Sequence, residues 1–228
     1  MNPDPLDPGG FELVVFDFDG TLCDSADIKT QAFSELYLDE RGLEFSTTVL
    51  DYHMANAGVS RYTKIRHIET EFIGAEPTRE QVDAVAARFS RMVEDAVVAA
   101  PLFDGVTQFL GAARWRARIA VASATPEDEL LRIVDRKGIG GFFDAVNGSP
   151  RTKADIIGKL SERFAVGPDR IVMVGDQPSD QDAAKEARVT SLIIAPPAPW
   201  VETVHRVDTF AEAADWLNRR IAGSADHR

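Results

Sequence analysis

Val14–Ser25 reads Val-Val-Phe-Asp-Phe-Asp-Gly-Thr-Leu-Cys-Asp-Ser and is the most informative stretch of the chain. An apolar run ends there in two carboxylates, Asp17 and Asp19, separated by one residue. Because side chains alternate along a strand, both carboxylates leave it on the same side. Two anions at the end of a buried strand are costly unless a cation or a proton lies between them. The pattern therefore favours a Mg²⁺ site, since Mg²⁺ takes one or two carboxylates and fills its other positions with water and phosphate oxygens.

Composition narrows the classes of partner. The chain has 228 residues and a net charge of −12, which argues against nucleic acid and against anionic membrane surfaces as partners. A single cysteine, Cys23, excludes an internal disulfide and fits a reducing compartment. The first ten residues lack the features of a signal peptide, and no apolar run approaches transmembrane length. We therefore expect a cytoplasmic protein.

Two patterns of periodicity divide the chain. Helical periodicity runs without a convincing strand pattern through residues 26–99, with a first helix that is capped by Asp24 or Ser25 and ends at Gly42. Further helices are expected at 46–56, 60–73, 78–99, about 105–116, 126–137, 152–164, 178–187 and 210–221, and strands at 11–16, 117–122, 143–146, 170–174 and 190–194.

Alternating strands and helices predict an α/β fold with a parallel, Rossmann-like sheet covered on both faces. We predict an α/β catalytic core at 11–25 and 100–222, an inserted all-helical cap at 26–99, and flexible tails at 1–10 and 223–228. A helical module inserted beside the end of the first strand is placed to cover the edge where open parallel sheets bind ligands.

Polar residues also stand where other predicted strands end. Ser123 closes one strand, and Lys153 stands where a helix begins. A further strand ends in Gly175-Asp176-Gln177-Pro178-Ser179-Asp180, which adds two carboxylates. The carboxyl ends of parallel strands meet at one edge of a sheet, so these groups form a candidate site.

These elements, in this order and with a helical insert after the first, resemble the haloacid dehalogenase superfamily, in its phosphatase-like branch with a helical cap. The most specific parts are Asp17-Phe18-Asp19-Gly20-Thr21 and the Gly-Asp-x-x-x-Asp pattern that ends at Asp180. The resemblance covers residues 11–195 and implies a HAD-like core with a Mg²⁺-dependent phosphomonoester hydrolase activity.

The resemblance also implies a role for each motif residue. Asp17 would be the nucleophile that forms an aspartyl-phosphate, and Asp19 the general acid and base. Mg²⁺ would be held by Asp17, the backbone carbonyl of Asp19, and Asp176, with Asp180 supporting the metal site. The phosphoryl group would be bound by Ser123, Lys153, Gly20 and Thr21. This division fits phosphoryl transfer, which depends mostly on positioning and on charge stabilisation.

Some residues carry a structural alternative. Thr125 before Pro126 is better explained as a helix cap, and Asp182 as a structural charge near a helix start. In the insert, Gly58-Val59-Ser60-Arg61 is similar to a stretch in caps of the β-phosphoglucomutase branch, so Arg61 and Lys64 could set substrate specificity. An ordinary helix start capped by Ser60 explains that stretch equally well.

The expected function is phosphate release from a small phosphorylated metabolite, as in phosphoglycolate phosphatases. A sugar-phosphate mutase is the alternative, although Gly175-Asp176 replaces the Glu-Asp that is usual in mutases of that branch. A phosphonatase would need an imine-forming cap lysine, and neither Lys29 nor Lys64 has a supporting motif. A non-catalytic binding protein should have lost one of the key aspartates. The substrate and the oligomeric state stay open.

Overall fold

The computed structural model describes residues 10–56, 58–201 and 205–221. Its centre is a six-stranded sheet in which every pair of neighbours is parallel, in the order β3-β2-β1-β4-β5-β6. The strands are β1 (Leu13–Phe16), β2 (Arg118–Pro126), β3 (Ala145–Ser149), β4 (Ile171–Gly175), β5 (Thr190–Ile194) and β6 (His205–Val207). β1 lies between β2 and β4, where a doubly wound sheet of this order forms its ligand crevice.

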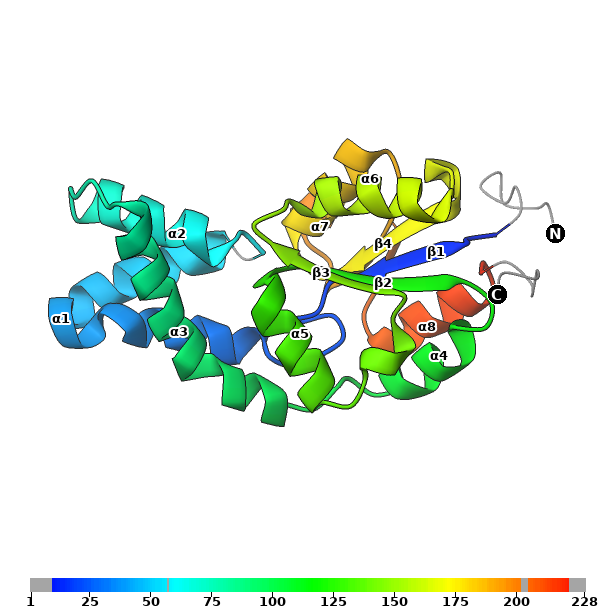
Figure 1. The fold of residues 1–228 in the computed structure, drawn as a ribbon, viewed down its shortest axis with the longest axis horizontal. Coiled ribbons are helices and arrows are strands. Elements are labelled where there is room, and N and C mark those ends of the chain that lie inside the picture. Colours follow the sequence, from blue (N-terminus) through cyan, green and yellow to red (C-terminus); the bar gives the residue numbers. More distant parts are fainter. Residues whose placement is uncertain (1–9, 57, 202–204, 222–228) are drawn as a thin grey trace.

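Helices cover both faces of the sheet (Figure 1). One face is covered by α4 (Val106–Ala113), α5 (Glu127–Arg136) and α8 (Phe210–Asn218), and the other by α6 (Lys153–Phe164) and α7 (Pro178–Ala187). The alternation of β1 explains this arrangement, because Val14 and Phe16 join the core on the first face while Leu13 and Val15 join the core on the second. The two-sided burial accounts for the unbroken apolar run of this strand.

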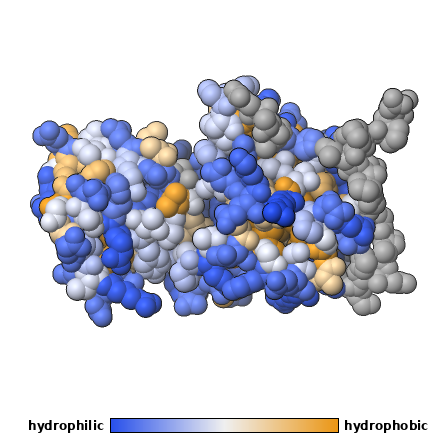
Figure 2. Space-filling view, turned by 90° about the horizontal axis from the view of Figure 1, so that it is seen from above, coloured by the Kyte–Doolittle hydropathy of each residue, from blue (hydrophilic) through white to orange (hydrophobic). Residues whose placement is uncertain are grey.

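The segment between β1 and α4 forms a separate helical lobe (Figures 1 and 2). It contains α1 (Ala26–Ala55), α2 (Arg61–His67), a π-helical turn (Ile68–Phe72) and α3 (Arg79–Ala99). As predicted, the helical path breaks at Gly42, whose φ of 80° is left-handed. The helices on either side of Gly42 follow each other directly, and α1 denotes both of them. Phe33 of α1 and Phe89 of α3 pack together with ring centroids 4.5 Å apart.

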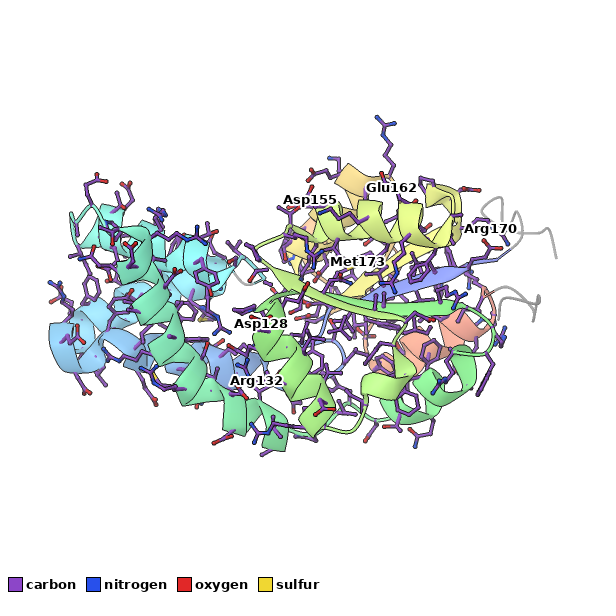
Figure 3. The ribbon with its side chains drawn as sticks, viewed as in Figure 1. Asp128, Arg132, Asp155, Glu162, Arg170 and Met173 are labelled. Atoms are coloured by element: carbon purple, nitrogen blue, oxygen red, sulfur yellow. The ribbon has the colours of Figure 1, made fainter. Side chains whose placement is uncertain are left out.

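The lobe is also tied to the sheet domain through α5. Arg132, labelled on α5 in Figure 3, donates a hydrogen bond of 2.8 Å to Glu94 of α3. A second contact joins Arg136 to Asp95 at 2.9 Å. These pairs join α3 of the helical lobe to α5 of the sheet domain.

Most predicted elements are confirmed, with shifts at their ends. β2 continues beyond the predicted Ala122 to Pro126, and β3 begins at Ala145 rather than at Phe143. β6 was not predicted, because three half-buried residues at a sheet edge show no readable period. The predicted tails lie largely outside the described residues, and the division into core and cap stays a proposal.

None of the described helices combines the length and the apolar character that crossing a membrane requires.

Candidate active site

Asp17 lies directly after β1 and is 5% exposed. Its Oδ2 accepts a hydrogen bond of 2.8 Å from Lys153 Nζ, and its Oδ1 accepts one of 2.7 Å from the backbone N–H of Phe18. Burial raises the pKa of Asp17 to about 7, against the lowering effect of Lys153. The carboxylates of Asp180 and Asp176 add to the rise. A further cation beside Asp17 would therefore stabilise its ionised carboxylate.

Asp17, Asp176 and Asp180 form a cluster of carboxylates at this edge of the sheet. One oxygen from each lies within 4.8 Å of the other two. Burial, and then the charge of Asp180, raises the pKa of Asp176 to about 6. Two of the three residues are buried and Asp176 is half-buried. Carboxylate oxygens that repel one another at such a place are the donors that a divalent cation such as Mg²⁺ prefers. The residues present therefore fit a metal ion.

Asp180 connects the cluster to its surroundings. Its Oδ1 accepts a hydrogen bond of 2.6 Å from Lys153, and its Oδ2 accepts the backbone N–H groups of Asp176 (3.2 Å) and Gln177 (3.0 Å). Although burial lowers it, the pKa of Lys153 is raised overall by the carboxylates of Asp17 and Asp180. Lys153 is thus a charged ammonium that neutralises part of the cluster. The supporting role predicted for Asp180 is compatible with this geometry and stays a prediction.

Gly20 and Thr21 form the turn after Asp19. Gly20 has a φ of 81°, and a Cβ there would lie 2.4 Å from Asp176 Oδ2. Only glycine permits both the left-handed backbone and this close approach. Thr21 Oγ1 donates a hydrogen bond of 2.8 Å to Asp176 Oδ1. In this structure the two residues contact the carboxylate cluster, and their predicted part in phosphate binding stays a prediction.

The Asp19 side chain is not part of that cluster and accepts donors from the start of α1 and from β2. Its Oδ1 accepts the hydroxyl of Ser25 at 2.6 Å, and its Oδ2 accepts the hydroxyl of Thr125 at 3.0 Å and the ammonium of Lys29. Although burial raises it, the pKa of Asp19 is lowered overall by the charge and hydrogen bond of Lys29, and then by the two hydroxyls. Its backbone carbonyl as a metal ligand stays a prediction.

One prediction about caps is confirmed in position and another is wrong. Ser25 is the N-cap residue of α1, as predicted, but it makes no capping hydrogen bond, because its hydroxyl donates to Asp19. Thr125 does not cap α5, whose N-cap is Pro126, and its hydroxyl also donates to Asp19. Both hydroxyls are drawn to the stronger acceptor, a buried carboxylate.

A cavity of about 100 Å³ lies between the sheet edge and the cap. From the core, Asp17, Ser123 and Asp176 line it, and from the cap, Arg61 and Lys64 do so. Ser123 is 1% exposed, and its Oγ accepts the backbone N–H of Thr125 at 3.1 Å. Asp19 also lines this cavity. Four other predicted site residues do not line it: Gly20, Thr21, Lys153 and Asp180.

The two cap residues differ in their partners. Arg61 donates to both carboxylate oxygens of Glu129 on α5, each at 2.8 Å, and to Ser90 Oγ at 2.6 Å. Lys64 instead lies 3.2 Å from His53 Nδ1. Arg61 therefore joins the cap to the core, whereas Lys64 stays within the cap.

Sequence reasoning did not find the roles of Lys29 and Glu129. Lys29 was weighed only as an imine-forming lysine, whereas the structure places it against Asp19 and, at 2.6 Å, Thr125. Glu129 follows Glu127 and Asp128 at the start of α5, where acidic residues are ordinary. Nothing in its spacing indicates a partner in the cap.

Comparisons with known proteins identify the family of the chain. The sequence model of the haloacid dehalogenase-like hydrolase family matches residues 11–188. The chain is 28% identical over 189 residues to the tyrosine-protein kinase PtkA of Mycobacterium tuberculosis, covering 80% of this chain but only 62% of that protein. It is 27% identical over 216 residues to the phosphoglycolate phosphatase of Synechococcus elongatus, covering 90% and 92% of the two chains.

The fold is also similar to a solved structure, the β-phosphoglucomutase of Clostridium difficile. The TM-score is 0.74 and the identity 17%, over 92% of this chain and 96% of the other. At that identity the likeness concerns the fold alone.

Proposed function

We propose, since this chain belongs to the haloacid dehalogenase-like hydrolase family, that it is a phosphatase that releases phosphate from a small phosphomonoester. One observation carries the proposal: the buried Asp17 carboxylate lies beside the Lys153 ammonium and two further carboxylates, while Asp19 accepts hydrogen bonds from Lys29 of the cap and from Thr125 of β2. A nucleophile and a separate acid–base group thus face one cavity. The phosphoglycolate phosphatase of Synechococcus elongatus, which this chain matches over most of its length, supports the same reaction class.

In the first step an oxygen of Asp17 attacks phosphorus, the bond from phosphorus to the ester oxygen breaks, and Asp19 gives its proton to that oxygen. In the second step water attacks the aspartyl-phosphate at phosphorus, and Asp19 takes a proton from the water. The bond between phosphorus and Asp17 then breaks, which releases phosphate and restores both carboxyl groups. Asp17, Asp176 and the Asp19 carbonyl would hold Mg²⁺, which would stabilise the negative charge of the phosphoryl group during transfer.

Asp19 must be protonated to act first as an acid, and here its contact with Lys29 favours the ionised form. The phosphate group of an incoming substrate competes with the Asp19 carboxylate for the Lys29 ammonium, because both groups are anions. Transfer of Lys29 from Asp19 to the substrate raises the pKa of Asp19 and frees it for proton transfer. Lys29 thereby couples substrate arrival to the acid step.

The test is phosphate release from a panel of phosphorylated metabolites with Mg²⁺, repeated with EDTA. Asp17→Asn removes the nucleophile, and Asp24→Asn is the matched control, since Asp24 is exposed. Release that EDTA and Asp17→Asn abolish, and that Asp24→Asn retains, is the expected result. No release from any substrate by folded, metal-binding protein would overturn the proposal.

A mutase is the second candidate, and the cap stretch Gly58–Arg61 is what favours it. Arg61 is already bound to Glu129, which weighs against its holding a sugar phosphate. Isomerisation of β-glucose 1-phosphate without net phosphate release would establish the mutase. Because the mycobacterial relative is named a tyrosine-protein kinase, a third assay measures transfer of phosphate from ATP to tyrosine.

A further inference from the structure

Gln177 has no part in the proposed chemistry, although it lies between the carboxylate cluster and the cap. It is half-buried, follows Asp176 directly and lines the cavity of about 100 Å³. Its side-chain amide Nε2 donates a hydrogen bond of 2.5 Å to Asp176 Oδ2. Gly58 of the cap lies against the same side chain. One residue thus adjoins both a candidate metal ligand and the lobe that covers the site.

We propose that Gln177 is a positioning residue: it orients Asp176 for the metal ion, and the packing of the cap at Gly58 holds it in place for this role. The inference rests on the proposed phosphatase function, because Asp176 is one of the residues that would hold Mg²⁺ there. Metal affinity then depends on a glutamine that is not itself a ligand, and on a glycine of the other lobe.

The Asp176 carboxylate is constrained at three points. Thr21 Oγ1 donates to its Oδ1 at 2.8 Å, and Gln177 Nε2 donates to its Oδ2. The backbone of Gly20 closes a third side, since a Cβ there would lie 2.4 Å from Oδ2. Among the described residues, Gln177 is the only hydrogen-bond donor to Oδ2. Its loss would leave that oxygen without a fixed direction.

These hydrogen bonds leave the carboxylate able to bind a metal. A carboxylate has about four lone pairs, and Thr21 and Gln177 use one on each oxygen. A metal ion therefore need not displace the amide. The amide instead restricts rotation of the carboxylate, so less conformational entropy is lost when the metal binds. Groups that orient metal ligands in this way contribute about 10- to 100-fold to metal affinity.

The main chain of Gln177 is fixed by α7. Gln177 is the N-cap residue of this helix, and its backbone N–H donates to Asp180 Oδ2 at 3.0 Å. Its backbone carbonyl accepts the N–H of Asp180 at 3.0 Å. The freedom that remains lies in the side-chain torsions, and a glutamine loses much conformational entropy when these are fixed. The position of the amide is therefore decided by what packs against the side chain.

Gly58 of the cap supplies that packing. It has a φ of 78°, and a Cβ built on it would lie 3.4 Å from Gln177 Cβ and 2.1 Å from Ser179 Oγ. The Ser179 hydroxyl is buried and, among the described residues, makes no hydrogen bond. The cap therefore meets the start of α7 here through close packing, which glycine allows. Without this contact Gln177 would gain rotamers, and Asp176 would lose its fixed donor.

The coupling between the cap and the metal is reciprocal. The free energy that the cap contact contributes to metal binding equals the free energy that the metal contributes to the cap contact. A metal-loaded site therefore favours the arrangement in which Gly58 lies against Gln177.

Titration calorimetry with Mg²⁺ on the full-length protein tests the positioning role without turnover. Gln177→Met keeps the length of the side chain but removes its donor, and we expect it to bind Mg²⁺ about 10- to 100-fold more weakly than the wild type. Gln108→Met, at an exposed position of α4, is the matched control and should bind like the wild type.

Gln177→Ser separates positioning from helix capping, because serine is a preferred N-cap residue but is too short to bring a donor to Asp176 Oδ2. We expect this variant to lose Mg²⁺ affinity as Gln177→Met does, while the metal-free protein keeps the unfolding midpoint of the wild type. A capping role predicts the opposite result, in which Gln177→Ser binds Mg²⁺ normally.

The cap contact is tested at Gly58. Gly58→Ala is expected to weaken Mg²⁺ binding about fivefold, because the added Cβ forces the cap and the start of α7 apart. The double variant Gly58→Ala/Gln177→Met should bind no more weakly than Gln177→Met, since Gly58 acts through Gln177. Gly74→Ala, which has the same left-handed backbone and open space around it, is the control and should keep the wild-type affinity.

The outcomes are distinct for the two proposals. Unchanged or tighter Mg²⁺ binding in Gln177→Met, or normal binding in Gln177→Ser, would overturn the positioning role while leaving the metal site and the phosphatase function in place. Additive losses in the double variant would overturn the path from Gly58 through Gln177. A wild type that binds no Mg²⁺ would remove the metal site itself and both proposals with it.

Discussion

The ion pair between Arg61 and Glu129 holds the cap against the core, and its removal should cost stability. The two side chains are 4% and 3% exposed and share two hydrogen bonds of 2.8 Å, and Ser90 Oγ adds a third to Glu129 at 2.5 Å. Removing one partner from a buried pair costs about 3–5 kcal/mol, because the other charge is left without compensation. We therefore expect Arg61→Met or Glu129→Leu to lower the free energy of unfolding by that amount.

The double variant Arg61→Met/Glu129→Leu should recover most of this loss, because two apolar side chains that replace a buried pair are close to neutral. The predicted coupling between the two sites is about 3 kcal/mol or more. Urea unfolding of the four proteins, followed by circular dichroism, measures it. Arg88→Met, which breaks an exposed cap pair with Glu40, is the control and should cost about 0–1 kcal/mol.

The reasoning fails if both single variants lose less than about 1 kcal/mol, or if their losses add in the double variant. Either result would mean that the charges reach water in the folded protein and that the cap does not rest on the core in this closed arrangement.

Three further predictions follow from the site. The raised pKa of Asp17 means that its contribution to the stability of the metal-free protein is fully present below about pH 4 and is lost as the pH rises through about 7. Mg²⁺ should therefore raise the unfolding midpoint more at pH 8 than at pH 5, and calorimetry at both values measures the difference. Gly58→Ala should raise KM, because a Cβ there would lie 2.1 Å from a hydroxyl oxygen of α7. Gly74→Ala, with the same left-handed backbone and open space, should leave KM unchanged. Lys29→Met should lower kcat about 10- to 100-fold, because Asp19 without the Lys29 ammonium keeps its proton and is a poor base for the second step. An unchanged kcat would contradict that role.

The sequence allowed the core of the site to be predicted from strand ends. Asp17 and Asp19 after the first strand, Ser123 in the second half of the second strand, and Asp176 before α7 all lie towards the carboxyl edge of the sheet, where parallel topology places them. These motifs could be read because each is local, and because the fold class follows from the alternation of strands and helices.

The contacts between the cap and the core could not be predicted in the same way. Arg61 and Glu129 are 68 residues apart, and Thr125 and Asp19 are 106 apart. Periodicity shows which face of a helix is apolar, but it carries no information on where one lobe rests on another. For that reason Thr125 was predicted to be a helix cap, and the contact of Arg61 with Glu129 was not predicted.

The sequence by itself determined the α/β class, the interruption after the first strand and the chemistry available at the strand ends, because these depend on local period and residue type. The tertiary structure alone decided the pairing of those groups: which carboxylates form a cluster, which one contacts Lys29, and which cap cation contacts a histidine rather than a carboxylate. The physical reason is that the state of a buried charge depends on its neighbours in space, and these neighbours come from elements far apart in the chain.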